Sequence, residues 1–383
     1  MVSFIKKILK PKYETLNEVQ IISNNLISNL KYLQSQQEKS EMFPVLKSNA
    51  YGHGLKEVCK ILNKTNTKMV AVDSFPEAQI VYKNFKGKVL ILGEMPLDVY
   101  KYCNFKRTEF IIYNTKTLKH ISRFKKRAKV HLFVNTGMNR EGIDDLNLFI
   151  ENNKKYIDKI EITGVCSHLA EADNQDSNFT KSQEEKFAKA LNILKVNKIY
   201  PKWVHIGNSS SIFNLKNDLY TAFRPGLALY GYNPLKETCK MFSEANKALK
   251  PALRLYSTVI STHKIKEGDK VSYSNSFIAK EDTTIAVIPF GYYEGLDRRF
   301  SNCTKFLFND KKGFFWGLIA GKVCMNITCI NCFNREVSVG DRVQIFSELK
   351  DAENSIENMA KKIDVITYEI LTSLKSNIKK KVV

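Results

Sequence analysis

The stretch FPVLKSNAYGHGLKEV, residues 43–58, decides the fold. Its apolar run 43–46 is typical of a short buried strand, and Lys47 closes that run. Gly52 and Gly54 then interrupt the chain before a helical pattern begins. A buried ammonium group is destabilising unless it is paired or discharged. A lysine at the end of a core strand therefore requires an explanation from its neighbours.

Short apolar runs alternate with helical patterns from this stretch to about residue 231. A helix is also expected before the first run, in NLISNLKYLQSQ. The expected strands are residues 43–47, 69–74, 88–93, 110–114, 129–136, 160–169, 203–209 and 223–231. Alternation of this kind indicates a parallel sheet, and this many strands in succession favour a (β/α)₈ TIM barrel over an open sheet.

The pattern changes after about residue 245, where β-rich segments are joined by Gly and Asp turns and a helical period returns near the C-terminus. We expect residues 1–244 to form the barrel and residues 245–383 to form a C-terminal β-rich domain. The C-terminal ends of barrel strands carry the active site. Polar residues gather at those expected ends: Lys47, His168, Asn208, Ser209 and Arg224.

The basic composition does not by itself indicate a nucleic-acid partner. The chain has 60 Lys and Arg against 39 Asp and Glu, a formal net charge of +21. The basic residues are scattered, and the densest runs, KKILKPK and KKKVV, are short and lack interleaved aromatic residues. We therefore expect a small-molecule substrate rather than a nucleic acid.

The cysteines and the apolar segments narrow the class further. Cys324, Cys329 and Cys332 form a tight group in CMNITCINC, but no histidine or second pair lies nearby, which favours strand cysteines over a metal or redox site. No apolar stretch approaches membrane-spanning length, and the N-terminus lacks a signal-peptide pattern. We expect a cytoplasmic protein without a metal site or a membrane contact.

A lysine at a barrel mouth can be desolvated, so that its free amine forms a Schiff base with an aldehyde such as pyridoxal phosphate. That cofactor also requires phosphate donors, a partner for its ring nitrogen and a proton donor or acceptor near the reacting carbon. For a lone lysine at a strand end, a surface residue that extends its ammonium group into water is the simpler interpretation. The neighbouring residues favour the cofactor.

KSNAYGHG is similar to the lysine motif of the alanine racemase family. Members of that family are barrel-type (fold-type III) pyridoxal-phosphate enzymes. Eight further segments resemble the family in the same order: HLFVNTGMNREG (131–142), VCSHLAEAD (165–173), HIGNSSS (205–211), RPGLALYG (224–231), KVSYSNSF (270–277), GYYEGLDRR (291–299), AGKVCMN (320–326) and ITYEIL (366–371). The resemblance covers about residues 12 to 372, and the family fold agrees with the division expected above.

The resemblance implies a catalytic role for each matching residue. Lys47 would form the Schiff base and carry the proton on one face of the substrate α-carbon, and Tyr273 would be the second base on the other face. Racemisation requires two such groups because the proton leaves from one side and returns on the other. Arg224 would face the pyridine nitrogen, His168 would bridge Tyr273 and Arg224, and His205 would support Arg224.

The resemblance also implies the binding residues. Contacts to the cofactor phosphate would come from Tyr51, Ser209, Tyr368 and the backbone of Gly226 and Leu227. Asn208 would orient that loop or serve as a plain turn residue. Arg140 would lie near the phenolic oxygen of the cofactor and the substrate carboxylate, Met325 would contact that carboxylate through its backbone, and Tyr292 would stand at the pocket entrance.

In this family the second base and the methionine segment come from the partner subunit, so the resemblance implies a head-to-tail homodimer with shared active sites. It implies that the protein interconverts L- and D-alanine and supplies D-alanine for bacterial peptidoglycan. Some residues depart from the family. Phe133 replaces a lysine that is often carbamylated, Asn135 and Asn139 replace aspartate and glycine, Asn326 replaces aspartate, and SNIKKKVV lacks the usual arginine-proline ending.

These departures leave other activities open. One is a racemase for serine or for a broader set of amino acids. Another is a barrel-type decarboxylase, although Arg224 at the ring nitrogen disfavours it because decarboxylation benefits from an acidic partner there. The third is a non-catalytic pyridoxal-phosphate carrier, although small carriers of that kind lack the β module that contains Tyr273.

Overall fold

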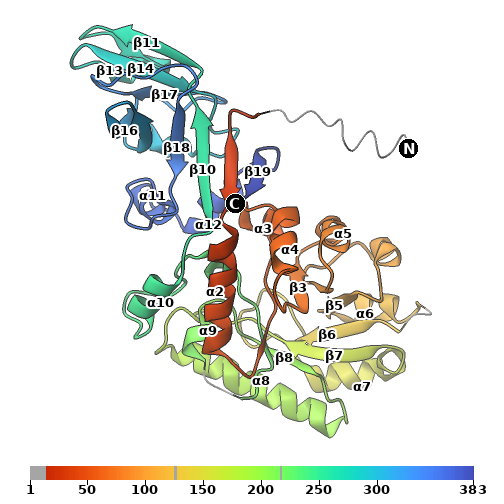
Figure 1. Cartoon of the computed structure of the whole chain (residues 1–383). Helices are drawn as coiled ribbons and strands as arrows, with labels where there is room; N and C mark the ends of the chain where they lie inside the picture. Colours follow the sequence, from red (N-terminus) through yellow and green to blue (C-terminus); the bar gives the residue numbers. More distant parts are fainter. Residues whose placement is uncertain (1–13, 125–126, 216–217) are drawn as a thin grey trace, which may run out of the picture. The chain divides into compact units, whose positions relative to one another are not determined.

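The computed structural model describes residues 14–124, 127–215 and 218–383 (Figure 1). The basic run KKILKPK lies outside the described residues. The chain divides into two compact units. One contains Ile21–Ala252 and Val382–Val383, and the other contains Leu253–Lys381 together with the described residues before Ile21. Residues 244 and 245 lie in α10 (Phe242–Ala248), within the first unit.

The first unit is built on parallel strands. A six-stranded sheet has the order β3-β4-β5-β6-β7-β8, and β2 pairs with β9 in parallel. The strands are β2 (Glu41–Met42), β3 (Met69–Val72), β4 (Lys88–Ile91), β5 (Thr108–Ile112), β6 (Lys129–Phe133), β7 (Glu161–Cys166), β8 (Trp203–His205) and β9 (Ala222–Phe223). Both faces of such a sheet are buried, which explains the nearly continuous apolar runs.

Hydrogen bonds at the two edges close these strands into a barrel. Val45 forms a parallel bridge with Ala71 of β3, which joins the β2 segment to one edge. At the other edge, the amide of Thr221 donates to the carbonyl of Val204 over 2.9 Å, and that of Arg224 donates to Gly207 over 3.0 Å. Because β2 also pairs with β9, the ring is complete, and the predicted barrel is confirmed.

Helices follow the strands and lie outside them (Figure 1). Asn114, Asp145 and Ser177 each accept an amide hydrogen bond three residues ahead and so fix the starts of α6, α7 and α8. The helices of this unit are α2 (Ser23–Gln36), α3 (Lys47–Tyr51), α4 (Leu55–Leu62), α5 (Phe75–Asn84), α6 (Thr115–Ile121), α7 (Leu146–Ile157), α8 (Asn178–Val196) and α9 (Ser211–Asn214), with 3₁₀ helices η1 (Leu97–Tyr102) and η2 (Leu227–Tyr230).

Most of the expected strands end earlier than predicted, and the first and last differ most. In residues 223–231 only Phe223 lies in a strand, and Leu227–Tyr230 form η2. Pro225 cannot donate to a ladder, and a buried apolar run looks alike in a strand and in a helix. In residues 43–47 the last strand hydrogen bond belongs to Leu46, whose amide donates to Ala71 over 2.7 Å. Lys47 therefore begins α3 rather than ending a strand.

The second unit is β-rich, as predicted. Its main sheet is nine-stranded with the order β11-β14-β17-β16-β15-β18-β10-β1-β19, and the ladders between β10, β18, β15, β16, β17, β14 and β11 are antiparallel. The strands are β1 (Glu18–Ile21), β10 (Leu253–Thr258), β11 (Ser261–Ile265), β14 (Thr283–Ile288), β15 (Lys305–Asp310), β16 (Gly313–Ile319), β17 (Thr328–Asn331), β18 (Arg342–Phe346) and β19 (Lys379–Val382).

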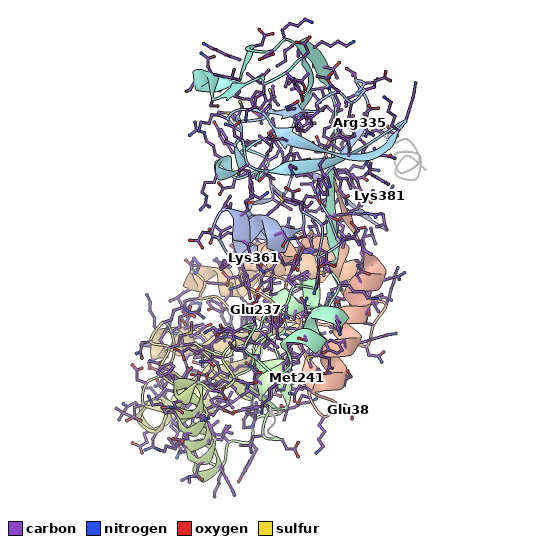
Figure 2. All side chains as sticks on the ribbon, turned by 90° about the vertical axis from the view of Figure 1, so that its left-hand side faces the viewer. Glu38, Glu237, Met241, Arg335, Lys361 and Lys381 are labelled. Carbon is purple, nitrogen blue, oxygen red and sulfur yellow. The ribbon has the colours of Figure 1, made fainter. Side chains whose placement is uncertain are left out.

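Smaller elements complete this unit. β12 (Lys270–Val271) and β13 (Phe277–Ile278) form a separate pair that flanks η3 (Tyr273–Asn275). α11 (Ile356–Lys362) and α12 (Thr367–Ser373) lie between β18 and β19 in the chain. Arg335, labelled in Figure 2, makes a two-pronged contact with Asp310 over 2.8 and 2.5 Å, which ties the β15–β16 hairpin to the segment after β17.

Candidate active site

Lys47 stands at the mouth of the barrel, immediately before a left-handed turn. Ser48, Asn49, Ala50 and Tyr51 have φ of 54°, 55°, 54° and 51°. This conformation is disfavoured for residues with a side chain, by about 1–2 kcal/mol each. Glu77 holds the turn by accepting from the amide of Asn49 over 3.2 Å, and the Asn49 side chain accepts from the amide of Leu55 over 2.9 Å. The strain is thus offset locally, which is typical of a functional site.

The turn brings Tyr51 against the loop after β9. A Cβ added at Gly226 would lie 2.6 Å from the Tyr51 hydroxyl oxygen, so only glycine allows this approach. The hydroxyl of Ser209 accepts from the amides of Gly226 and Ala228 over 2.9 and 3.2 Å. Leu227 begins η2 directly afterwards. The tyrosine hydroxyl, the serine hydroxyl and these amides form a polar cluster, which we call the cradle.

Asn208 organises the loop that carries Ser209. Its side-chain oxygen accepts from the amides of Ser210 and Ser211 over 3.0 and 3.3 Å, and from the Ser211 hydroxyl over 3.1 Å. These bonds lie within its own loop, so the structure supports the orienting role of Asn208 and gives it no outward contact.

Arg224 is buried, with 7% of the residue exposed. Its Nη2 donates to the carbonyl oxygen of Ser167 over 2.6 Å and contacts Nδ1 of His168 at 3.3 Å. Its Nη1 donates to the carbonyl oxygen of His205 over 2.9 Å and to Nδ1 of the same ring. These partners are carbonyls and ring nitrogens, not carboxylates. Burial lowers the pKa of Arg224, but a guanidinium starts so high that it stays protonated.

His168 is partly buried at the same mouth. Burial and the charges of Arg224, Arg140 and Lys47 lower the pKa of His168 to about 3, so its ring is neutral. Because a guanidinium can only donate, Nδ1 of His168 accepts from Arg224 and the ring proton lies on Nε2. Lys47, Arg140 and Arg224 thus all lie close enough to His168 for their charges to act on its ring.

The loop between β6 and α7 carries Arg140. The side chain of Arg140 is 55% exposed, and its Nε lies 3.5 Å from a carboxylate oxygen of Glu141. Asn135 stiffens the loop, since its Nδ2 donates to Asn139 over 3.0 Å and to Asp144 over 2.7 Å. Phe133 is buried and packs on Tyr113, with ring centroids 5.0 Å apart.

The remaining predicted residues lie in the β-rich unit. Tyr273, Met325 and Tyr292 are 72%, 56% and 44% exposed. The amide of Tyr292 donates to Cys324 over 3.0 Å, which ties its loop to the segment that carries Met325. The Ser272 hydroxyl donates to the carbonyl of Lys322 over 3.0 Å, so the Tyr273 segment joins the same cluster of loops. Such exposure of apolar and aromatic side chains is typical of a surface that a partner covers.

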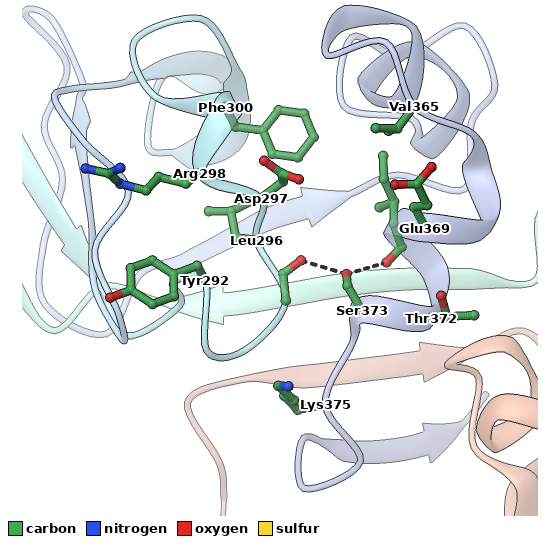
Figure 3. A pocket seen from close by; sticks show the side chains of 12 residues that line it. Tyr292, Leu296, Asp297, Arg298, Phe300, Val365, Glu369, Thr372, Ser373 and Lys375 are labelled. Carbon is green, nitrogen blue, oxygen red and sulfur yellow. Dashed lines mark hydrogen bonds between the residues drawn. The ribbon is translucent and has the colours of Figure 1, made fainter.

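A pocket lies beside this cluster (Figure 3). Tyr292, Arg298 and Lys375 line it, and the Ser373 hydroxyl donates to the carbonyl of Gly295 over 2.9 Å at its wall. Tyr368 lies in α12, the helix that borders the pocket. Burial raises the pKa of Tyr368 to about 12, so its hydroxyl remains protonated and able to donate.

Sequence reasoning missed two buried polar residues inside the barrel. Glu109 of β5 and His131 of β6 are 1% and 0% exposed, and Oε2 of Glu109 lies 2.9 Å from Nε2 of His131. Nδ1 of His131 in turn lies 2.7 Å from Nε2 of His205. The available signal was a carboxylate within the apolar run TEFII, which is as unfavourable in a core strand as Lys47.

Comparison with known proteins places this site in a family. The sequence model of "Alanine racemase, N-terminal domain" matches residues 21–234, and that of "Alanine racemase, C-terminal domain" matches residues 252–382. The chain belongs to the alanine racemase family. Members of this family are pyridoxal-phosphate-dependent isomerases, so this chain is a pyridoxal-phosphate enzyme, as predicted.

Individual relatives agree along nearly the whole chain. An alanine racemase of Borreliella burgdorferi is 36% identical over 366 residues, which cover 92% of this chain and 93% of that protein. An alanine racemase structure from Clostridium difficile 630 has a TM-score of 0.86 at 25% identity and covers 97% of both chains. The alanine racemase of Bartonella henselae, solved with covalently bound pyridoxal phosphate, has a TM-score of 0.82 at 23% identity and covers 97% of this chain and 100% of that chain.

The described helices do not include one with the length and apolar character needed to span a membrane. Basic residues occur in both units of the described chain. Several are paired individually with carboxylates at separate places, for example Lys39 with Asp218 at 2.9 Å and Lys266 with Asp282 at 2.6 Å.

Proposed function

We propose that this protein interconverts L- and D-alanine with pyridoxal phosphate. The observation that carries the proposal is the convergence at one barrel mouth of an amine, a buried guanidinium, a neutral histidine and the cradle. They belong to Lys47, Arg224, His168 and the Tyr51–Ser209–Gly226 loops respectively. Family membership supports alanine as the substrate, because the relatives of this chain are named alanine racemases.

The donor set of the barrel fits the cofactor. Tyr51, Ser209 and the amide of Leu227 would hold the phosphate, because hydroxyls and backbone N–H groups suit a dianion. Gly226, whose own amide donates to Ser209, would let the backbone approach the phosphate closely. Tyr368 would add a further hydroxyl, and Asn208 would keep the serine loop in place. Lys47 is the amine to which the aldehyde would attach.

When bound, pyridoxal phosphate withdraws electrons from the α-carbon of the substrate and makes its proton acidic. Arg224 would face the ring nitrogen. Because the guanidinium keeps its own proton, it would hold that nitrogen unprotonated and limit electron withdrawal. A limited electron sink favours return of the proton over loss of carbon dioxide, which supports a racemase over a decarboxylase.

Two groups would move the proton. Lys47 would take it from one face or return it there, and Tyr273 would do the same on the opposite face, so that either enantiomer serves as substrate. His168 is neutral with its proton on Nε2, since Arg224 occupies Nδ1. We infer that this Nε2–H donates to the Tyr273 oxygen and stabilises it when it has given up its proton.

Three residues would place the substrate. Arg140 would receive the carboxylate, because its planar guanidinium offers two parallel donors. Its side chain is half exposed, and its acidic neighbour is Glu141, whose carboxylate oxygen lies 3.5 Å from Nε. The backbone of Met325 would contact the same carboxylate, and Tyr292 would narrow the entrance.

We further propose a head-to-tail homodimer in which Tyr273 and Met325 complete the site of the partner subunit. The exposure of both side chains, 72% and 56%, supports this arrangement because a second subunit would cover them. We also propose that the enzyme works in the cytoplasm and supplies D-alanine for peptidoglycan. The eight cysteines, all within the described residues, are free thiols, which suits a reducing compartment.

A panel experiment tests the substrate. The purified, cofactor-loaded protein is incubated with single L-amino acids, and formation of each D-isomer is followed by chiral chromatography. We expect D-alanine to form faster than any other product. A faster formation of D-serine would refute alanine as the main substrate while leaving the racemase assignment intact.

A mixing experiment tests the dimer. Lys47→Ala and Tyr273→Phe should each be nearly inactive alone. If sites are shared, mixed dimers contain one intact site, and random exchange of subunits should restore about 25% of the normal activity. A mixture that remains as inactive as its components, although the subunits have exchanged by native mass spectrometry, would contradict shared sites.

A further inference from the structure

A continuous row of polar side chains crosses the barrel interior and ends at Arg224. It starts at Lys88 of β4, whose Nζ lies 2.8 Å from Oε1 of Glu109 on β5. Oε2 of Glu109 contacts Nε2 of His131 on β6 at 2.9 Å, and Nδ1 of His131 contacts Nε2 of His205 on β8 at 2.7 Å. Nδ1 of His205 then accepts from Nη1 of Arg224. The three side chains between Lys88 and Arg224 are almost completely buried.

The chemistry of the two ends makes every hydrogen bond between Arg224 and Glu109 donate in the same direction. A guanidinium only donates and an ionised carboxylate only accepts. Arg224 therefore donates to Nδ1 of His205, and the proton of His205 lies on Nε2 and is donated to Nδ1 of His131. The proton of His131 likewise lies on Nε2 and is donated to Glu109. Every donor in the row meets an acceptor, with both histidines neutral.

The charges of the row agree with this direction. Burial raises the pKa of Glu109, but hydrogen bonds from His131, Lys88 and Thr163 outweigh it and lower the pKa. Burial lowers the pKa of His131, although Glu109 opposes that shift, and burial together with Arg224 lowers the pKa of His205. The row thus has a buried anion at one end, a buried cation at the other and two neutral rings between them.

Arg224 needs such a counter-charge. The partners of its Nη atoms are carbonyl oxygens and ring nitrogens, and a buried cation without an anion is strongly destabilised. A chain of hydrogen bonds in a low dielectric polarises each link, so the carboxylate strengthens the acceptor that faces the guanidinium. Glu109 is the carboxylate that the row connects to Arg224.

We propose that Glu109 and His131 are positioning residues for Arg224, which fix the orientation of its guanidinium toward the ring nitrogen of the cofactor through His205. This proposal deepens the proposed function and rests on it, since Arg224 has this task only in a pyridoxal-phosphate enzyme. Neither residue touches the cofactor, so their effect is transmitted along the row. Loss of the Glu109 charge should weaken the hold on Arg224 while leaving the cradle unchanged.

Glu109→Gln removes the charge and keeps the shape. The control is Glu161→Gln, because Glu161 begins β7, two strands from β5 in the same sheet, and pairs with Lys129 at 3.8 Å rather than with a histidine. Removing an ionic hydrogen-bond partner lowers a rate by about 10- to 100-fold when the bond acts in the reaction. We expect kcat of Glu109→Gln to fall by about that factor with KM for alanine changed less than about threefold, and Glu161→Gln to resemble the unaltered enzyme.

A spectroscopic readout separates positioning from mere structural support. The visible absorption of the bound cofactor, followed from pH 6 to pH 10, should change its pH dependence in Glu109→Gln but not in Glu161→Gln. An equal fall in kcat for both variants, or a Glu109→Gln enzyme with normal kcat and normal absorption, would overturn the proposal.

The unaltered protein provides a further test, whose readout is the protonation of its own histidines. The chain has 6 histidines, so ¹⁵N labelling of histidine in the full-length, cofactor-loaded protein gives a sparse long-range ¹H–¹⁵N spectrum. His131→Gln and His205→Gln would assign the two rings. Both are expected to be neutral with the proton on Nε2, and a proton on Nδ1 of either ring would overturn the proposal. If the unaltered enzyme failed to racemise alanine, the proposed function would fall, whereas these protonation states would still report on the row.

Discussion

Gly226→Ala tests how the cradle is built. A Cβ at this position would lie 2.6 Å from the Tyr51 hydroxyl oxygen, whereas ordinary contact begins at 3.4 Å. Tyr51 therefore has to withdraw by about 0.8 Å, the difference between those two distances. Gly226 has φ of −109° and ψ of −93°, outside the α and β regions that residues with a side chain prefer. Alanine should therefore displace the tyrosine hydroxyl and also add backbone strain at residue 226.

The expected magnitude follows from the contact that is lost. A hydrogen bond to a charged group contributes about 1.5–3 kcal/mol. If the displaced hydroxyl no longer reaches the phosphate, the Kd for pyridoxal phosphate should rise about 10- to 150-fold. The crowded side chain should also lower the free energy of unfolding by about 1–3 kcal/mol.

The assay is a titration of cofactor-free, full-length protein with pyridoxal phosphate, followed by absorbance, with thermal unfolding measured in parallel. Tyr51→Phe removes the hydroxyl and should weaken cofactor binding by a similar factor. It also removes the atom with which the new Cβ collides. Gly226→Ala made in the Tyr51→Phe protein should therefore weaken binding little further, a non-additive result. Full additivity of the two changes would refute the proposed contact between Tyr51 and the phosphate.

The remaining predictions concern the loop, the pH dependence and the lysine. Asn135→Asp should raise KM for alanine several-fold, because it puts a carboxylate 2.7 Å from that of Asp144 in the loop that carries Arg140. Adding Asp144→Asn should restore the normal KM. An unchanged KM in Asn135→Asp alone would contradict this role of the loop. Burial lowers the pKa values of His131 and His205 in the folded protein. Below about pH 6.5 these histidines therefore bind protons in the unfolded chain but stay neutral in the folded protein. The free energy of unfolding in urea should therefore fall by up to about 1 kcal/mol per histidine between pH 6.5 and pH 5.5, and a flat or rising profile would be the opposite outcome. Borohydride reduction should attach the cofactor permanently to Lys47, as located by peptide mass spectrometry, and should leave Lys47→Ala unlabelled. A label on another lysine would disprove the assignment.

Most of the barrel could be predicted from the sequence because its strands are buried on both faces. A short apolar run between two helical patterns, such as Met69–Val72 or Lys88–Ile91, fits a buried parallel strand better than any other element. The prediction failed at Leu227–Tyr230, where burial without periodicity suits a strand and a 3₁₀ helix equally. Pro225 and Gly226, which directly precede that run, were the available sign that the strand ends there.

The site was predictable only where family motifs carry it. Lys47 drew attention by its own chemistry, but Tyr273 resembles any strand aromatic until the resemblance gives it a role. The pairing of Glu109 with His131, and of His131 with His205, joins residues 22 and 74 positions apart. Such contacts depend on barrel closure and on which side chains point inward, and no local pattern encodes them.

Incubation with L-alanine in deuterated water tests the central claim most directly. The cofactor-loaded protein should form D-alanine and place deuterium on the α-carbon, because a proton leaves on one face and a solvent-exchanged proton returns on the other. Tyr273→Phe should still bind pyridoxal phosphate yet lose most of this turnover. Full activity of Tyr273→Phe would contradict the two-base mechanism, and absence of α-proton exchange with any amino acid in the unaltered protein would contradict racemisation itself.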